Sequence, residues 1–456
     1  MLVAMLGAIF IGFPISFTLL LLALIFGWIG LGDRAFYIMV FQTIGIMKEE
    51  VLAAVPLFIF MGYLMEQGGL MERLFKGFQL MMGPVPGSLY VGVLITATIF
   101  GIAAGTVGAT VVLMGIMAVP IMTKAGYNIP MSAGAITAGG TLGILVPPSV
   151  MLVVMGPVMG VSVAELYASC FGPGFLLAGI FILYCLVRSI INPSLGPPLP
   201  PEERTGSFKE IAIELTMGMV PHAILIIATL GTIIWGWATP TEAAAMGVVG
   251  AAFLAVIYGQ FTWQRLKDAV YNTLLQSSTV IFLAVCGNVF GAVFSRLGTA
   301  KVATDALLSW QMPPVAMLTL IMVVIFLLGW PFEWPAIILV FVPLMQPVIV
   351  AMKIDMLWFA TLIAINLQTA FLSPPVAMSA YYLKGVAPQW SLGDIYRGMG
   401  QFMVLQLVGL ALCIIFPEIA LWFPRYLFGK KPRDGGGAMK PRNIVIAWIA
   451  FALPVC

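Results

Sequence analysis

The stretch "GGTLGILVPPSVM", residues 139–151, lies inside a segment that is apolar enough to cross a lipid bilayer. It nevertheless contains three glycines in its first five residues and the pair Pro147-Pro148 near its end. Proline removes a backbone donor and clashes with the preceding helical turn, so the stretch predicts an interrupted membrane helix. Inside a membrane, freed backbone groups are tolerated only where they line a cavity or are buried in protein. The interruption is therefore either a kink made for packing or part of a binding site.

The composition of the whole chain predicts an all-α polytopic membrane protein. Of 456 residues, 61% are hydrophobic and 9% are charged, and the mean hydropathy is +1.09. Soluble domains carry about 25% charged residues. Apolar runs long enough to span a bilayer recur along the chain and predict about 11 or 12 membrane helices. The net charge of +3 is spread over short loops, which gives no basic patch for nucleic acid.

A second copy of the opening stretch occurs later in the chain, as "NLQTAFLSPPVAM", residues 366–378. Four features recur at one offset of 227 residues (374 − 147). They are Pro147-Pro148 with Pro374-Pro375, Leu145 with Leu372, Met151 with Met378, and Pro120 with Pro347. Duplicated halves with interrupted helices in matching places are typical of secondary transporters, so the pattern predicts two duplicated halves and favours the binding-site interpretation.

A second unusual element precedes each interruption. The run "FGIAAGTVGATVVLMGIMAVP" (100–120) is part of an apolar segment too long for one span, and it predicts two short helices that meet at a glycine-threonine tip as a re-entrant hairpin. The run "LLGWPFEWPAIILVFVPLM" (327–345) has the same form and contains Glu333 at its tip. A carboxylate in such apolar sequence indicates function. The alternative is an interfacial turn anchored by Trp330 and Trp334.

Several motifs together resemble the large membrane subunit of the TRAP (tripartite ATP-independent periplasmic) transporters. These are "GWATPTEAAAMGVVGA" (236–251), "IGFPISFTLLL" (11–21), "VLAAVPLFIFMGYLME" (51–66), "GGTLGILVPPS" (139–149) and "NLQTAFLSPPVAMSAYYLKGVAP" (366–388). The resemblance runs from about residue 7 to 428 and is nearest to the branch named for mannitol or chloroaromatic compounds. On its own residues, "TPTEAAA" (239–245) predicts a capped helix start, with ion binding as the alternative.

The resemblance implies a sodium-coupled importer of organic acids in the bacterial inner membrane, and not an enzyme. It implies two partners, a small four-helix membrane subunit and a periplasmic substrate-binding protein. It also implies an elevator-type fold with two re-entrant hairpins and two unwound helices. On this chain the hairpin tips are Gly105 to Thr110 and Trp330 to Pro335, and the unwound helices are Gly140 to Pro148 and Asn366 to Pro375.

These elements predict five segments along the chain. They are the N-terminal scaffold helices (1–86), a first transport repeat with a hairpin and an unwound helix (87–192), a connection with scaffold helices (193–273), a second half with the second hairpin and unwound helix (274–428), and a polar linker with a short apolar tail of unknown role (429–456).

The resemblance also implies site residues. For the substrate they are Gly105, Thr106, Gly140, Thr141, Glu333, Gln368 and Thr369. For the coupling ion, Na⁺, they are Thr106, Gly108, Thr110, Thr141, Gly143, Pro147, Trp330, Asn366, Thr369, Ser373 and Pro374. The first tip, "AGTVGAT", departs from the serine-rich tip of many members but keeps hydroxyls at Thr106 and Thr110. Glu333 either tunes ion coupling or opposes an anionic substrate.

Three other functions remain open at this stage, and one of them is a structural subunit that only houses other components. The chain could be a stand-alone ion-coupled carrier or antiporter that needs no binding protein. It could instead be a membrane-embedded enzyme, which the sequence disfavours because it contains one histidine and no HExxH, P-loop or GxSxG motif.

Overall fold

The computed structural model describes residues 1–66, 70–199, 208–374 and 377–429. Pro375 and the "KKPRDGGG" linker with its apolar tail therefore lie outside the described residues. Within these ranges the chain is helical and contains no strand. Seven of the described helices are long and apolar enough to span a membrane, or up to nine if each of two bent pairs is one span, and five more are apolar and 10–17 residues long. The prediction of an all-α polytopic protein is confirmed.

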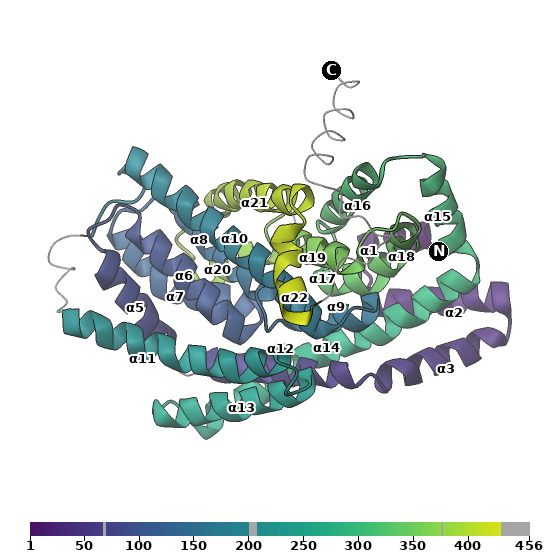
Figure 1. Ribbon diagram of the computed structural model, residues 1–456, viewed down its shortest axis with the longest axis horizontal. Coiled ribbons are helices and arrows are strands. Elements are labelled where there is room, and N and C mark those ends of the chain that lie inside the picture. The colour runs from purple at the N-terminus through teal and green to yellow at the C-terminus, as the bar shows by residue number, and fades with distance from the viewer. Residues whose placement is uncertain (67–69, 200–207, 375–376, 430–456) are drawn as a thin grey trace, which may run out of the picture.

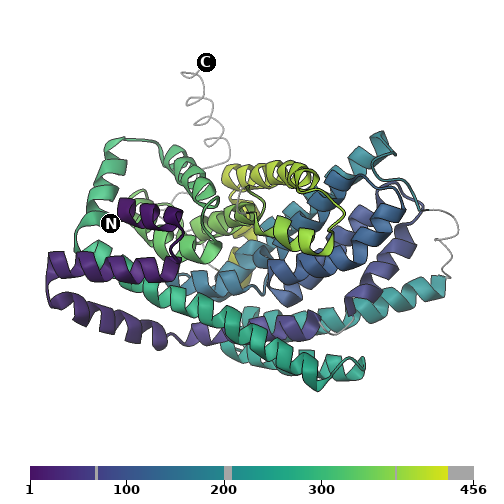
Figure 2. The same ribbon diagram turned by 180° about the vertical axis from the view of Figure 1, so that it is seen from behind.

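One group of helices forms a long layer along the lower edge of the molecule (Figures 1 and 2). Its members are α2 (Ile15–Leu31), α3 (Arg34–Met47), α4 (Ala54–Glu66), α11 (Phe208–Ile226), α13 (Pro240–Ile257) and α14 (Trp263–Arg296). Helices α2, α3 and α4 pack on α14, and α13 packs on α4. Smaller elements flank the layer: α1 (Leu2–Ile11), η1 (Glu50–Ala53), α5 (Leu70–Met82), η3 (Ile227–Gly231), α12 (Thr232–Ile234) and α15 (Thr299–Ser309).

Above this layer lie two repeats that contain the hairpins and the interrupted helices (Figure 1). The first repeat comprises α6 (Ser88–Ala104), α7 (Val107–Lys124), α8 (Ile129–Leu145), α9 (Val150–Met159) and α10 (Val163–Ile191). The second comprises α16 (Pro314–Leu328), α17 (Trp334–Ala336), η4 (Ile337–Phe341), α18 (Val342–Ala351), α19 (Met356–Leu367), η5 (Gln368–Phe371), α20 (Met378–Val386) and α21 (Leu392–Ile415). Helix α22 (Glu418–Phe428) follows and packs on α10.

Two helix pairs of the repeats begin 227 residues apart. Helix α7 covers Val107–Lys124, and the continuous helix α17–η4–α18 covers Trp334–Ala351. The next pair, α8 and α19, begins with the same type of cap: the Asn128 side chain accepts a hydrogen bond from Met131 N at 3.1 Å, and Asp355 accepts one from Trp358 N at 3.0 Å. The other pairs begin within two residues of this offset, so the structure supports the predicted duplication.

The first interruption is shorter than the predicted range of Gly140 to Pro148. Helix α8 stays helical to Leu145, and only Val146–Ser149 are non-helical before α9 begins, with a bend of 44°. The reason is local, because a residue before proline avoids helical geometry. Val146 accordingly adopts φ −78° and ψ 123°, and the Pro147-Pro148 peptide is cis. Glycine alone does not unwind the helix upstream of the prolines.

The other elements are also narrower than predicted. The first hairpin turns at Gly105 and Thr106 alone, because Val107 to Thr110 already form the first turn of α7. The second hairpin turns over residues 329–333, and Trp334 and Pro335 begin α17. In the second interrupted helix, α19 continues to Leu367, tightens into η5 and resumes as α20 at Met378.

Small residues bring each hairpin against the interrupted helix of its own repeat. A Cβ on Gly101 in α6 would lie 2.6 Å from the Cα of Gly143 in α8. In the second repeat, a Cβ on Gly329 would lie 3.1 Å from the Cβ of Ala370. Such close backbone approach is typical of helix packing in membranes. Gly143 of the opening stretch therefore serves close packing, while the prolines cause the interruption.

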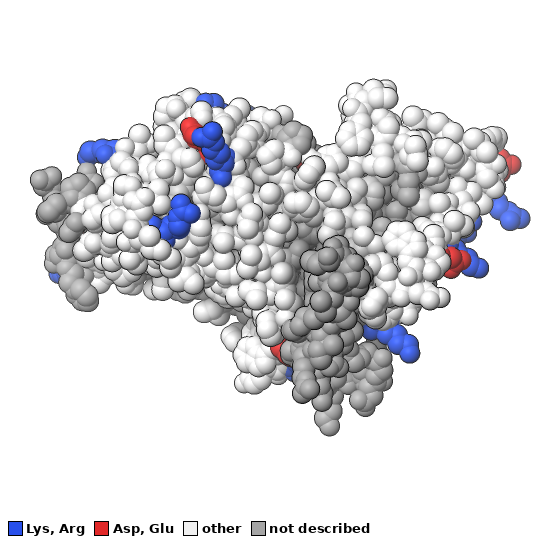
Figure 3. Space-filling view, turned by 90° about the horizontal axis from the view of Figure 1, so that it is seen from above, with Lys and Arg blue, Asp and Glu red and all other residues white. Residues whose placement is uncertain are grey.

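Charged side chains are sparse on the surface. On the face shown in Figure 3 they lie in small groups, and most of the described surface is uncharged. Such a surface is expected for a protein that faces lipid, since charge in the hydrocarbon core of a bilayer is expensive.

Candidate functional site

A cavity of about 700 Å³ lies where the two repeats face the lower layer. It is lined by residues of α4, α7, α8, α9, α14, α17, η5 and α20 together with both hairpin tips. On the side of α14 the lining residues Leu275 and Thr279 are exposed, so the cavity opens past this helix. Its volume is in the range of small-molecule binding sites.

The starts of four helices converge on this cavity. The lining residues Thr106 and Val107 begin α7, Val150 begins α9, Trp334 begins α17, and Met378 begins α20. None of these four starts has a side-chain cap within the described chain. Elsewhere the described helix starts are mixed. Some carry such a cap, from Asn128, Thr239, Thr262, Asp355 and Ser391, and others, such as those of α2, α6 and α10, carry none.

The convergence of these starts has a direct electrostatic consequence. The first turn of a helix presents unbonded N–H groups and carries a partial positive charge, so an uncapped start can bind an anion. The start of α17 contributes least, because Pro335 has no N–H and Ala336 N donates to the Glu333 carbonyl oxygen at 3.1 Å. The starts of α7, α9 and α20 thus offer an anion several backbone donors without any basic side chain.

The charged side chains in the cavity have the opposite sign. Glu66 and Glu333 line it, and no Lys, Arg or His is among its described lining residues. Nearby, the Tyr63 hydroxyl donates to Gln276 Oε1 at 3.0 Å. The ring of Tyr382 lies over Gly108, where an added Cβ would meet the ring carbon Cζ at 3.2 Å. The cavity therefore combines backbone donors with two carboxylates and tyrosine hydroxyls.

A buried polar cluster joins α8 of the first repeat to η5 and α21 of the second. Gln406 Nε2 donates to Thr141 Oγ1 at 2.9 Å, and this hydroxyl lies 2.8 Å from the Ala138 carbonyl oxygen and 3.2 Å from Gln368 Oε1. All three side chains have at most 1% exposure. Thr141 and Gln368 are separated by 227 residues, the offset of the repeats. A residue contacts its own repeat mate only if both lie on the axis that relates the repeats, so this pair marks the pseudo-two-fold axis.

The second interrupted helix adds more polar groups to this region. Thr369 Oγ1 donates to the Asn366 carbonyl oxygen at 2.6 Å, and Ser373 Oγ donates to the Thr369 carbonyl oxygen at 2.8 Å. Asn366 Nδ2 donates to the Met322 carbonyl oxygen at 2.7 Å, whereas Asn366 Oδ1 has no hydrogen-bond partner among the described residues. A buried acceptor without a partner is costly, and an ion could satisfy it.

The structure divides the predicted site residues between these regions. Gly105, Thr106, Gly108 and Glu333 line the cavity. Thr141, Gln368, Asn366, Thr369 and Ser373 lie buried around the second interrupted helix and the pseudo-two-fold axis. The remaining predicted residues lie apart from the cavity lining, and they are Thr110, Gly140, Gly143, Pro147, Trp330 and Pro374.

Some of these remaining residues have a visible packing role. A Cβ on Gly140 would lie 2.4 Å from Val111 Cγ2, so this glycine lets α7 and α8 approach. Thr110 Oγ1 donates to the Thr106 carbonyl oxygen at 2.8 Å and thereby supports the first hairpin tip.

Sequence reasoning missed Glu66, Tyr382 and Gln406. Glu66 and Tyr382 stand inside two of the motifs that carry the family resemblance, and Gln406 is an amide in the apolar part of α21. A polar residue placed in this way is a usable signal. Only the folded chain, however, brings these three elements together with the hairpin tips.

The "TPTEAAA" motif has a structural role. Thr239 Oγ1 accepts from Glu242 N at 3.3 Å and Glu242 Oε2 accepts from Thr239 N at 2.8 Å, which is a capping box at the start of α13. Thr241 Oγ1 also donates to the Glu50 carbonyl oxygen at 3.0 Å and so ties α13 to η1.

A duplicated helical membrane body with interrupted helices around a central cavity is the architecture of a secondary transporter. Comparison with known proteins identifies the family of transporters to which the chain belongs. The family described as "Tripartite ATP-independent periplasmic transporter, DctM component" matches residues 2–419. The chain belongs to this family. It is a large permease component, a multi-pass protein of the bacterial inner membrane and a transporter rather than an enzyme.

Among similar proteins, the sialic acid TRAP transporter large permease protein SiaM of Vibrio cholerae is 30% identical, over 93% of this chain and 97% of that protein. The ectoine TRAP transporter large permease protein TeaC of Halomonas elongata is 28% identical over 92% and 97%. The C4-dicarboxylate TRAP transporter large permease protein DctM of Rhodobacter capsulatus is 28% identical over 84% and 88%.

Comparison of this chain with solved structures supports its fold and nothing beyond the fold. The YdaH transporter of Alcanivorax borkumensis superposes with a TM-score of 0.63 at 16% identity, covering 90% of this chain and 97% of that one. MtrF of Neisseria gonorrhoeae superposes with a TM-score of 0.57 at 13% identity, covering 83% of each chain.

Proposed function

We propose that this permease imports an organic acid together with Na⁺, after a periplasmic binding protein has delivered the acid and with a small four-helix membrane subunit as partner. One observation carries the proposal: four uncapped helix starts converge on one cavity between the repeats. A carboxylate is the anion that such N–H groups would bind without a basic side chain.

The relatives support this class of substrate. Their names refer to sialic acid, ectoine and C4-dicarboxylates, all of which carry a carboxylate group. The two acidic side chains of the cavity narrow the class further. Because Glu66 and Glu333 repel a second carboxylate, we expect the rest of the substrate to present hydroxyl or ammonium donors to them.

The polar groups near the second interrupted helix support a sodium site. Asn366 Oδ1 is buried without a described partner, and the lone pairs of the Thr369 and Ser373 hydroxyls remain available because these groups donate their protons to carbonyls. Carbonyl and hydroxyl oxygens at unwound helices are the ligands that transporters use for Na⁺.

The layered architecture supports an elevator motion in which the repeats move with their re-entrant hairpins. The cavity lies where the repeats meet α4 and α14 of the lower layer. If the repeats slide along this layer as one body, the cavity is carried between the two membrane faces.

The decisive experiment is uptake into proteoliposomes. The chain, its small membrane subunit and its binding protein would be reconstituted and tested with labelled sialic acid, ectoine and succinate under an inward sodium gradient. The proposal expects uptake of at least one acid that needs all three proteins and collapses when Na⁺ is replaced by K⁺. Sodium-driven uptake by the chain alone would instead support a stand-alone carrier, and uptake that ignores Na⁺ would refute the coupling.

A further inference from the structure

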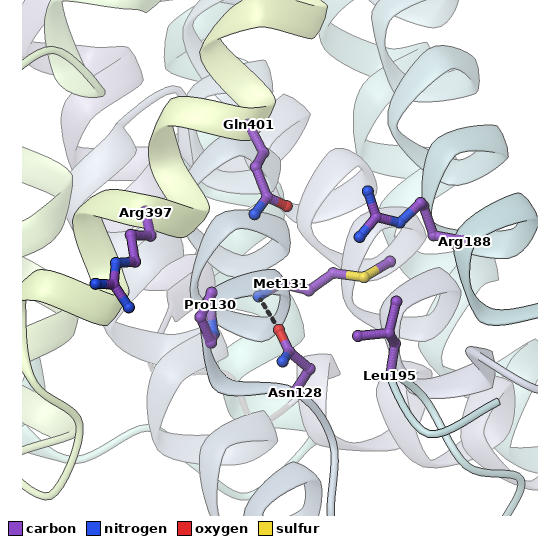
Figure 4. Close-up of a pocket in the computed structure, with 7 residues that line it drawn as sticks. All are labelled: Asn128, Pro130, Met131, Arg188, Leu195, Arg397 and Gln401. Carbon is purple, nitrogen blue, oxygen red and sulfur yellow. Dashed lines mark hydrogen bonds between the residues drawn. The ribbon is translucent and has the colours of Figure 1, made fainter. Parts of the chain in front are cut away.

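A second pocket, of about 340 Å³, lies where α8 begins, α10 ends and α21 begins (Figure 4). It shares no lining residue with the central cavity. Polar side chains reach it from three elements: Asn128 before α8, Arg188 on α10, and Arg397 and Gln401 on α21. In Figure 4, Arg188 extends toward Gln401, while Arg397 lies at the opposite rim beyond Pro130.

The acceptors at this pocket are already used. Asn128 Oδ1 accepts from Met131 N at 3.1 Å, and Gln401 Oε1 accepts from the Tyr184 hydroxyl at 2.9 Å. The Leu195 carbonyl oxygen accepts from the Tyr90 hydroxyl at 2.6 Å and from Asn128 N at 2.9 Å. Each side-chain amide oxygen thus already accepts a hydrogen bond, whereas no hydrogen bond is made by the NH₂ groups of Asn128 and Gln401 to the other described lining residues, so the pocket offers a ligand mainly donors.

The charge of the pocket is positive as well. Its described lining residues include two arginines and no acid. The Arg188 guanidinium carbon lies 5.7 Å from the centre of the Tyr184 ring, which supports it from one side. Among the described residues, Asp394 lies near one of these two arginines, with its Oδ1 3.8 Å from Arg397 Nη1, at the limit of an ion pair. Guanidinium groups and amide donors together select an anion with several oxygens, above all a phosphate.

Apolar side chains continue from the pocket along the same two helices. On α10 and α21 these residues are 43–76% exposed: Leu183, Val187, Ile190, Ile191, Val404 and Val408. In a membrane-spanning protein such a surface faces acyl chains. A phosphate held at the pocket would thus have hydrocarbon next to it.

We propose that this pocket binds the phosphate group of an anionic phospholipid, with Arg188 as the main contact and Arg397 closing the rim. Basic pockets between membrane helices are typical binding sites for anionic head groups. The competing explanation is that Arg188 only compensates the negative end of α10, in whose last turn it lies.

The test is thermal unfolding of the purified chain in detergent with three additives: short-chain phosphatidylglycerol, the matching phosphatidylcholine, and inorganic phosphate. Phosphatidylglycerol should raise the melting temperature, and the other two should not. Arg188→Gln should raise the half-saturating concentration of phosphatidylglycerol about tenfold, which is the effect of losing one charge-assisted hydrogen bond.

Arg296→Gln is the matched control. Arg296 also lies in the last turn of a long helix, but this helix is α14, which contributes no lining residue to the pocket. This control variant should leave the phosphatidylglycerol effect unchanged. Gln401→Glu provides a second variant, since it keeps the acceptor for Tyr184 and adds a repelling charge, and it should also weaken the effect. Equal stabilisation by phosphatidylcholine, full stabilisation by inorganic phosphate, or equal losses in Arg188→Gln and Arg296→Gln would overturn the proposal.

Discussion

Replacing Thr141 by valine tests the buried cluster at the pseudo-two-fold axis. Valine has nearly the same shape, so it leaves no cavity and removes only the hydroxyl. That hydroxyl is fully buried, accepts from Gln406 Nε2 at 2.9 Å and lies 3.2 Å from Gln368 Oε1. The variant leaves the Gln406 amide without its acceptor, which costs about 1–3 kcal/mol in a buried site.

The same change should weaken sodium binding if the cluster supports the coupling ion. A hydrogen-bonding oxygen that serves a charged group contributes about 1.5–3 kcal/mol, which corresponds to a rise of about 10- to 100-fold in the half-saturating sodium concentration. The assay is uptake by the reconstituted three-protein system against sodium concentration. Thermal unfolding in NaCl and in choline chloride would show whether the loss is specific to sodium.

Thr137→Val is the matched control. Thr137 lies one turn earlier on α8 and is equally buried, but its hydroxyl donates only within its own helix, to the carbonyl oxygens of Ala133 at 2.7 Å and Gly134 at 3.3 Å. It should leave the sodium dependence unchanged. If Thr141→Val lowers the melting temperature yet keeps the sodium dependence of the parent, the cluster is structural and the reasoning is wrong.

Three further predictions concern packing, capping and charge. Gly101→Ala would place a Cβ 2.6 Å from Gly143 Cα and should destabilise the protein by about 1–3 kcal/mol in unfolding experiments, whereas Gly179→Ala, which meets nothing within 4 Å, should not. Thr239→Ala removes the capping box of α13 and should cost about 1 kcal/mol in the same assay without changing substrate preference; a change in sodium dependence would instead favour the ion-binding interpretation of that motif. Glu333→Gln should improve uptake of dicarboxylates relative to monocarboxylates that carry hydroxyl or ammonium groups, and an unchanged preference in competition assays would show that Glu333 does not face the substrate.

The sequence predicted the interrupted helices because their cause is local. Prolines prevent helical geometry at and before themselves, so Pro147 and its repeat mate Pro374 indicate where each helix ends. The extent of unwinding was predicted too widely, because the family resemblance extended the unwound segment back to Gly140, into a part of α8 where Gly140 and Gly143 lie. In the structure they remain helical and allow close packing against Val111 and Gly101.

The composition of the cavity could not be predicted in the same way. Glu66 belongs to α4 and Tyr382 to α20, and no spacing rule connects two helices that are separated by most of the chain. Gln406 reaches Thr141 across 265 residues. Such convergence depends on tertiary packing, and only the contact between Thr141 and Gln368 has a simple signature in the sequence, namely the repeat offset itself.

The duplication also explains how the cavity acquires its polarity. Thr106 and Glu333 occupy equivalent positions (333 − 106 = 227), each directly before a helix whose uncapped start lines the cavity. Two identical halves would present the same group from both hairpin tips and could not distinguish one end of a substrate from the other. With a hydroxyl at one tip and a carboxylate at the other, the backbone donors at the first tip stay open to an anion, while those at the second face a fixed negative charge. An asymmetric acid should therefore bind with its carboxylate toward Thr106 and its hydrogen-bond donors toward Glu333.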